Sequence, residues 1–372
     1  MTNKIKNILI TILFFSIIIG FFLGNIIKKD EKISVAERRK LTSFPEFSVS
    51  NLLNGTFFSK FDSYVTDQFV EREKFRKLKV ETELNVFRKN DYNKLYEYNG
   101  YLIENLYPLN EKSVSNVVNK INQIKDNYLT SNNNVYFTII PDKNYFVDDG
   151  NLKLDYTKLE NIMKNGVKNA TYIDIKSELK LEDYYKTDSH WKQENIVKIA
   201  KKITENIKND NTQDYMLQTI NTKKYASETL ANFRGTYSGR IPLAVDDDKI
   251  TILTNEEIKN AKVFFADDNK EGPVYDLSKL NSLDKYDVYL SGAKALITIE
   301  NESAESDKEL VMFRDSYGSS LAPLLISEYK KITVVDTRYI SPKLLSNYIE
   351  FNNQDILFAY SAILINNSTS LK

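Results

Sequence analysis

Apolar runs of strand length alternate with amphipathic helical segments along much of the chain, and this alternation constrains the fold more than any other feature. Residues 135–140 form an almost entirely apolar run that ends at Pro141, as expected of a strand buried on both faces. A helical pattern with a valine and isoleucine stripe precedes it at 111–129, and the same rhythm returns over 310–360. Such alternation predicts an α/β fold with a mainly parallel sheet in three layers.

One region interrupts this pattern and another precedes it. Residues 208–305 hold short strand-like pieces among polar turns, which indicates an inserted, partly β region; the pieces are 249–253, 263–266, 288–290 and 295–299. Residues 51–90 place apolar side chains at helical spacing and predict two helices that break near 70–72. Asn99-Gly100 predicts a tight hairpin turn. The sequence therefore predicts a large α/β domain over 111–372, which contains the insertion and is preceded by a stalk and helical region over 30–110.

The N-terminal segment is apolar enough to enter a membrane. Residues 8–27 contain no charge, and 20 helical residues span about 30 Å, the thickness of the hydrocarbon core. Lysines flank the segment on both sides, and no small-x-small cleavage site follows it. We therefore expect an uncleaved signal-anchor over residues 1–29, with a single pass through the cell membrane and the body outside the cytoplasm. A cleaved signal peptide is the alternative.

Composition excludes several classes of site. The chain has no cysteine, one histidine and one tryptophan, which rules out disulfides, thiolate metal sites, thiol nucleophiles and sites with several histidines. We therefore expect no metal and no cofactor. Basic and acidic residues are equal at 51 each, but four lysines lie within the first 29 residues. The body is thus mildly acidic, which argues against nucleic-acid binding.

Two short motifs carry the groups for nucleophilic catalysis. Ser316 follows a predicted strand and precedes a predicted helix, where a hydroxyl is exposed and free backbone N–H groups can face an oxyanion. Serine needs a base, and His190 is the only imidazole in the chain. Asp188 precedes it by two residues, and in an extended segment such positions face the same side. Taken alone, each motif also fits an ordinary turn or a helix cap.

Asp188-Ser189-His190-Trp191 resembles the signature of the DHHW proteins of Gram-positive bacteria, which are similar to the alginate O-acetyltransferase group of SGNH-hydrolase-like enzymes. The resemblance covers nearly all of the chain after the apolar segment; its stretches are 37–41, 64–72, 140–143, 187–191 and 313–319. It implies an SGNH-like fold with Ser316 as nucleophile, His190 as base and Asp188 as the orienting acid. The pairing of Asp-x-His with Asp-Ser carries the resemblance, and the other stretches support it.

Two features depart from the common pattern. The Asp/His motif precedes the Ser motif, which reverses the order of ordinary SGNH hydrolases and matches the alginate group. Ser189 stands where the family name has histidine, but it is only the spacer between acid and base. The usual oxyanion segments have no clear match, and Gly292 is a candidate for that role. Arg314 and Tyr317 are candidates to line the substrate pocket, and packing is the competing explanation for both.

The resemblance implies a membrane-anchored O-acetyltransferase of the cell envelope. It would pass an acetyl group to a cell-surface or secreted polysaccharide, as in exopolysaccharide biosynthesis, and a membrane-bound acyltransferase would supply the acetyl donor. A carbohydrate acetylesterase is one alternative, because the same triad with water as acceptor hydrolyses the ester. A non-catalytic glycan-binding or scaffold protein of the envelope is the other.

Overall fold

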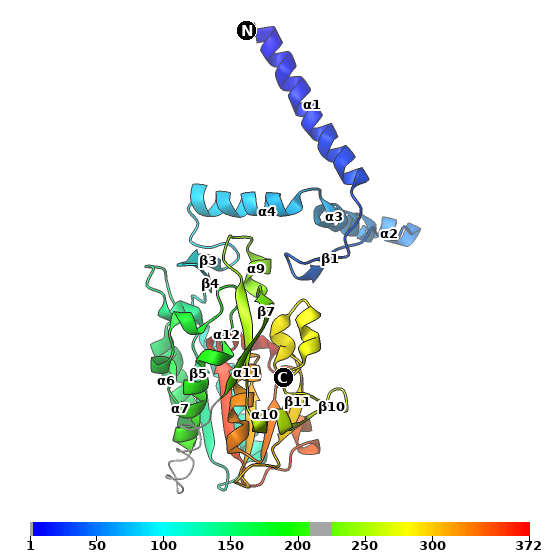
Figure 1. Ribbon diagram of the computed structural model, residues 1–372. Coiled ribbons are helices and arrows are strands. Elements are labelled where there is room, and N and C mark those ends of the chain that lie inside the picture. Colours follow the sequence, from blue (N-terminus) through cyan, green and yellow to red (C-terminus); the bar gives the residue numbers. More distant parts are fainter. Residues whose placement is uncertain (1–2, 208–224) are drawn as a thin grey trace. The chain divides into compact units, whose positions relative to one another are not determined.

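The computed structural model describes residues 3–207 and 225–372, which form two compact units (Figure 1). The first unit extends to Tyr92 and includes Ser238–Ala244, and the second comprises Asn93–Tyr237 and Val245–Lys372. The boundaries expected from the sequence, at residues 29 and 110 and around an insertion at 208–305, stay predictions. Part of that insertion, residues 208–224, lies outside the described residues.

An eight-stranded sheet forms the centre of the second unit. Its strands are β5 (Val135–Ile140), β6 (Thr171–Tyr172), β9 (Lys262–Phe265), β10 (Lys270–Gly272), β11 (Leu296–Glu300), β12 (Glu309–Arg314), β13 (Lys331–Val335) and β14 (Asp355–Ser361). They lie in the order β10-β9-β11-β13-β12-β14-β5-β6. The five strands from β13 to β6 are parallel, whereas β11, β9 and β10 extend the sheet antiparallel. The predicted mainly parallel α/β fold is confirmed.

Hydrophobic cores lie on both faces of this sheet, because successive side chains of a strand point to opposite faces. Leu310 and Met312 of β12 join one core, and Val311 and Phe313 join the other. Helices α7 (Val197–Ile207), α10 (Glu256–Asn260) and α11 (Tyr317–Leu325) contribute to the first core. Helices α5 (Glu111–Tyr128), α6 (Tyr156–Gly166) and α12 (Ala362–Asn366) contribute to the second. The sheet is therefore the middle layer of three.

The strand-like pieces expected between 208 and 305 have different outcomes. The piece at 249–253 is β8 (Asp248–Thr254), which pairs with β7 (Ala226–Phe233) in a separate antiparallel hairpin. The pieces at 263–266 and 295–299 are β9 and β11, which belong to the main sheet. The strand expected at 288–290 is wrong, since a 3₁₀ helix ends at Val288 and Leu290 has a positive φ of 52°.

The hairpin expected at Asn99-Gly100 is confirmed. Strand β3 (Leu95–Tyr98) pairs antiparallel with β4 (Tyr101–Glu104). Both turn residues have positive φ, 48° for Asn99 and 79° for Gly100, which is the backbone geometry that an Asn-Gly turn favours.

The first unit is helical. It contains α1 (Asn3–Ile27), α2 (Val49–Leu53), α3 (Thr56–Gln68), α4 (Arg72–Glu81) and a short β1–β2 pair, Ile33–Ser34 with Arg39–Lys40. The predicted break near 70–72 is confirmed, because α3 ends at Gln68 and α4 starts at Arg72. Among the described residues, α1 alone is long and apolar enough to cross a membrane, a property that a signal sequence shares.

Candidate active site

Ser316 lies at the carboxyl edge of the parallel sheet, between the end of β12 and the first residue of α11. The neighbouring residue Asp315 is buried and fixes this turn. One of its carboxylate oxygens accepts a hydrogen bond from the N–H of Tyr317 at 3.1 Å, and the other accepts from the N–H of Ser361 at 2.9 Å. Because Ser361 ends β14, Asp315 ties the turn that carries Ser316 to the adjacent strand. Ligands commonly bind at this edge of an α/β sheet.

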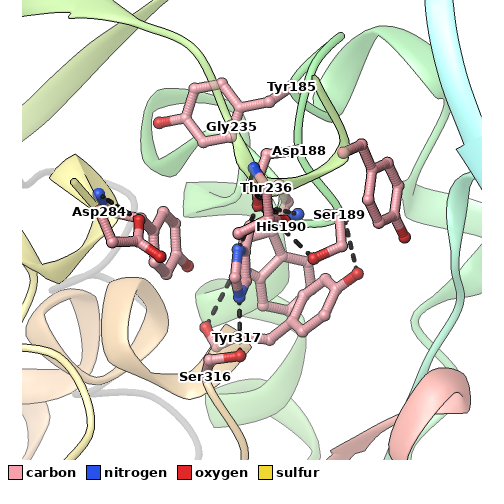
Figure 2. Close-up of polar contacts among 12 residues, drawn as sticks. Tyr185, Asp188, Ser189, His190, Gly235, Thr236, Asp284, Ser316 and Tyr317 are labelled. Atoms are coloured by element: carbon pink, nitrogen blue, oxygen red, sulfur yellow. Dashed lines mark hydrogen bonds and ion pairs between the residues drawn. The ribbon is translucent and has the colours of Figure 1, made fainter. Parts of the chain in front are cut away.

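The structure brings Ser316, His190 and Asp188 together (Figure 2). His190 Nε2 lies 2.7 Å from Ser316 Oγ, and His190 Nδ1 lies 2.5 Å from Asp188 Oδ1. Since Asp188 can only accept at Nδ1, the ring donates there and offers the lone pair of Nε2 to the serine hydroxyl. All three groups thus form one chain of hydrogen bonds. Their catalytic roles stay a prediction.

The segment that carries Asp188 and His190 is bent, so the expectation of an extended segment is wrong. Residues 186–190 form a continuous bend. Asp188 Oδ1 accepts a hydrogen bond from the backbone N–H of His190 at 3.1 Å as well as contacting its ring. The carboxylate folds the chain back on itself, which brings residues i and i+2 together without alternation along a strand.

Asp188 is fully buried, and its other oxygen has two partners. Asp188 Oδ2 accepts from the N–H of Thr236 at 2.7 Å and from its hydroxyl at 2.9 Å. Burial alone raises the pKa of the Asp188 carboxyl, but the charge and hydrogen bonds of His190 and the N–H of Thr236 outweigh it and hold the pKa well below its usual range. The group is therefore a carboxylate that can stabilise an imidazolium.

The loop before His190 is held by residues that the sequence did not single out. Asp248 accepts hydrogen bonds from the N–H groups of Lys186 and Thr187, both at 2.8 Å, and from the Thr187 hydroxyl at 2.7 Å. Gly235 donates its N–H to the same hydroxyl at 2.8 Å. An added Cβ on Gly235 would lie 2.2 Å from the Cβ of Asp188, so this close approach requires glycine.

Lys143 supports the same loop from the end of β5. Its side chain is fully buried, and Nζ donates to the carbonyl oxygens of Tyr185 at 3.0 Å and Lys186 at 3.4 Å. The ammonium also lies 4.9 Å from the ring centre of Tyr237. Burial lowers the pKa of Lys143, and the adjacent carboxylate of Asp142 opposes that shift. The 140–143 stretch of the family resemblance thus has a structural role next to the site.

Aromatic rings enclose the imidazole. The ring of Tyr286 stacks on His190 at 3.8 Å with an interplanar angle of 11°, and the ring of Tyr317 lies tilted at 4.8 Å. Tyr286 and Trp191 both hydrogen-bond Ser320 Oγ, at 2.8 and 2.9 Å. The single tryptophan is therefore a buried structural residue that fixes the backbone beside His190. Tyr286 was not foreseen, because a tyrosine in a polar stretch carries no distinctive signal.

Shortening Tyr286 should show what its ring contributes. We expect Tyr286→Leu to lower the rate on an acetyl ester about 10-fold or more, since the imidazole loses the stacked face that fixes its plane. Tyr286→Phe keeps the ring and loses only the hydrogen bond to Ser320, so it should change the rate less than about 3-fold. Steady-state rates of the two variants provide the comparison. Equal rates for both would mean that the stacked ring has no role in positioning His190.

The three other predicted site residues have different surroundings. Tyr317 is buried beside His190, and its hydroxyl donates to the carbonyl oxygen of Ser189 at 2.7 Å. Arg314 is 1% exposed and lies 3.4 Å from Asp336 Oδ2. Its Nε and Nη2 have no hydrogen-bond partner among the described residues. Gly292 donates its N–H to the carbonyl oxygen of Tyr289, so that N–H is not free to face an oxyanion.

The N–H groups at the start of α11 also differ from expectation. Tyr317 and Gly318 donate their N–H groups to Asp315, so the prediction that both are free is wrong. The N–H of Ser316 has no acceptor in the described part of the chain. It is therefore the backbone donor that remains available next to the serine hydroxyl. The described ranges also contain no cluster of three or more His, Asp or Glu side chains that could hold a metal ion.

Comparisons with known proteins agree with this architecture. The model of the DHHW protein family matches residues 37–94, a stretch that includes none of the three residues of the hydrogen-bonded chain. A DHHW family protein from Eubacterium siraeum is 20% identical and superposes with a TM-score of 0.57 over 75% of this chain and 94% of that one. No curated protein matches the chain.

Two further solved structures match to different degrees. Bacillus cereus PatB1 with a sulfonyl adduct is 16% identical, with a TM-score of 0.58 over 73% of this chain and 95% of that one. The O-acetyltransferase domain of Pseudomonas putida AlgJ is 9% identical, with a TM-score of 0.44 over 73% and 92%, a level at which a shared fold is not shown. The fold is thus shared with the DHHW family protein from Eubacterium siraeum and with PatB1, and the predicted resemblance of this chain to the DHHW family is confirmed.

Proposed function

We propose that this chain is a membrane-anchored, extracytoplasmic O-acetyltransferase that transfers an acetyl group to a hydroxyl of a cell-surface or secreted polysaccharide. The observation that carries the proposal is the continuous hydrogen-bonded chain from Ser316 Oγ through His190 to Asp188. A serine hydroxyl becomes a nucleophile when a neutral imidazole can take its proton, and the imidazole needs a partner for the charge it then bears. His190 lies within hydrogen-bonding distance of Ser316 as the base, and Asp188 lies within hydrogen-bonding distance of His190 as the partner for its charge.

The first half of the reaction forms an ester on the enzyme. Ser316 Oγ attacks the acetyl carbonyl carbon of the donor, and its proton passes to His190 Nε2. The carbonyl π bond opens to an oxyanion, for which the unpaired N–H of Ser316 is a donor at hand. Collapse restores the carbonyl and breaks the bond to the donor, whose leaving atom takes the proton from His190. The products are acetyl-Ser316 and the deacetylated donor.

The second half passes the acetyl group on. A glycan hydroxyl gives its proton to His190 Nε2 and attacks the acetyl carbon of acetyl-Ser316. The tetrahedral species collapses, Ser316 Oγ leaves, and it recovers the proton from His190. Asp188 stays ionised throughout, because its depressed pKa keeps it a carboxylate beside the charged ring. No metal or other cofactor enters either half-reaction.

The choice of an acetyl group and a glycan rests on the family resemblance. The sequence resembles the alginate O-acetyltransferase group, and that resemblance also implies a membrane-bound acyltransferase as source of the acetyl group. The apolar, exposed helix α1 fits an anchor that holds the body at the outer surface. A carbohydrate acetylesterase would use the same three residues with water as acceptor. The intact hydrogen-bonded chain favours either enzyme over a non-catalytic scaffold.

A sulfonyl fluoride tests the nucleophile, since PatB1, which shares the fold, is known with a sulfonyl adduct. We expect the full chain, purified in detergent and treated with phenylmethylsulfonyl fluoride, to gain one sulfonyl group on Ser316. Peptide mass spectrometry locates the adduct. Ser316→Ala should remain unlabelled, and His190→Ala should label far more slowly because the hydroxyl keeps its proton. An unlabelled Ser316 in folded wild-type protein would contradict the covalent mechanism.

Transfer and hydrolysis are separated by adding an acceptor. With 4-nitrophenyl acetate as donor, a transferase should acetylate an added oligosaccharide, and mass spectrometry of the sugar detects the gain. An esterase should release only free acetate whatever the concentration of sugar. Release of 4-nitrophenol, measured in parallel, reports the first half-reaction for both enzymes.

A further inference from the structure

Helix α3 of the first unit presents an apolar stripe to the outside. Phe58, Phe61 and Val65 are 60%, 39% and 41% exposed, and they continue to Phe69 just beyond the helix. Their spacing of three and four residues places them on one side of the helix. The opposite, polar side carries Ser59, Ser63 and Thr66. An exposed stripe of this length on a soluble surface is unusual and indicates a contact.

Helix α4 repeats this pattern on its own outer side. Phe75 and Leu78 are 44% and 57% exposed. Arg72 and Arg76 face the other way, toward the carboxylate of Glu37, and Arg76 also donates to the carbonyl oxygen of Gly239 at 2.8 Å. The basic residues therefore bind α4 to its own unit, while Phe75 and Leu78 on the other side stay about half exposed. The apolar side is thus available to a different environment.

Both stripes meet at the last turns of α1. The rings of Phe69 and Phe75 lie 5.6 and 5.5 Å from the ring of Phe21 in α1. Asn25 Oδ1 of α1 accepts a hydrogen bond from the N–H of Val70 at 2.9 Å. The joint between α3 and α4 is therefore bound to the C-terminal end of α1, and Figure 1 shows this joint near that end.

The position of this joint along α1 determines how deep the joint would lie in a bilayer that α1 spans. Asn25 precedes Lys28, the first charge after the apolar segment, by three residues, which is about 4.5 Å along a helix. Phe21 precedes it by seven residues, about 10 Å. Amphipathic helices that lie in a membrane surface bury their apolar sides about 5–10 Å into the boundary between headgroups and acyl chains. If α1 spans a bilayer, the joint lies at that depth.

We propose that α3 and α4 lie in the outer membrane–water interface beside α1, with Phe58, Phe61, Val65, Phe75 and Leu78 in the acyl boundary. This inference rests on the proposed anchoring of α1. The bilayer is favoured over a protein partner because the stripes are continuous with α1, whose apolar side chains are themselves exposed along its length. Lys74 and Lys77, beside the stripe of α4, suit the anionic headgroups of such a surface.

The absence of cysteine makes the test clean, since each introduced cysteine is the only one to carry a nitroxide spin label. Full-length protein is reconstituted in vesicles of phosphatidylcholine and phosphatidylglycerol. Phe58→Cys and Leu78→Cys report the stripes, and Ser63→Cys and Glu73→Cys report exposed polar sides of the same helices. Phe14→Cys, in the middle of α1, reports the anchor. Collisions with oxygen, which concentrates in lipid, and with a water-soluble nickel complex give the depth of each label.

We expect the two stripe labels to collide mainly with oxygen, at a depth of about 5–10 Å, and the two polar-side labels to collide mainly with nickel. Stripe labels in water while the Phe14→Cys label lies deep would overturn the inference and leave the anchor intact. A Phe14→Cys label in water would instead contradict the anchor itself. Stripe labels shielded from both reagents, with spin–spin broadening removed by unlabelled protein, would assign the stripes to a second copy and overturn the inference.

Discussion

Ser316→Ala and His190→Ala should each lower the rate of acetyl transfer by about 10⁴-fold or more, and the double variant should be no slower than the slower single variant. The reason is that the two groups act as one unit: a serine without its base and a base without its serine are equally unable to form acetyl-Ser316. The rate that remains comes from binding and from the oxyanion donor. Acetyl transfer, or hydrolysis of an acetyl ester, measures the effect.

Asp188→Asn should also lower the rate, by about 10²–10⁴-fold, because its role is to orient and stabilise rather than to form a bond. The amide loses the charge that stabilises the imidazolium. One oxygen of Asp188 accepts from His190 and the other accepts from Thr236. The amide replaces one of these two acceptors with an NH₂ group, which can only donate. A thermal melt should accompany each variant to separate a loss of catalysis from a loss of folding. This control matters most for Asp188, which is fully buried. Near-wild-type rates in a folded His190→Ala protein would leave the covalent mechanism without a base.

The main sheet could be predicted from the sequence where a strand is recognised by its own residues. The run at 135–140 and the strand at 310–313 are apolar on both faces, and this property is local. The role of β9 and β11 could not be predicted in the same way, because β11 joins the sheet by pairing with β13 and β9 joins it by pairing with β11. In both pairs the partner residues are about 30 or more residues apart in the chain. The strand at 288–290 failed for a related reason: its apolar residues pack in a core without forming a ladder.

The reacting groups of the site were predictable because they are rare. The chain has a single histidine, which lies next to its single tryptophan and two residues after an aspartate, so the sequence alone marks it as the candidate base. The groups that position them are common residue types from distant stretches. Thr236 and Gly235 lie about 50 residues from Asp188, and Tyr286 lies almost 100 from His190, so no spacing connects them in the sequence.

Gly235→Ala should lower the rate of acetyl transfer about 10²-fold or more, although Gly235 takes no part in the reaction. The added Cβ would lie 2.2 Å from Cβ and 2.7 Å from Cα of Asp188, and real Cβ atoms do not approach so closely. A backbone atom cannot move aside as a side-chain end can, so the loop must shift. A displacement of about 1 Å at the catalytic groups is enough for a loss of this size.

Gly272→Ala provides the matched control, since its Cβ would meet a ring atom of Phe265 at 2.6 Å, at β10 on the edge of the sheet. It should lower the melting temperature and leave the rate per folded molecule unchanged. The variant Gly235→Ala/Asp188→Asn then separates two causes. If alanine acts only by displacing Asp188, the double variant should be no slower than the slower single variant, because the same interaction is lost once. If the two losses multiply, Gly235 also holds something other than Asp188 in place, and Thr187, whose hydroxyl accepts the Gly235 N–H at 2.8 Å, is a candidate.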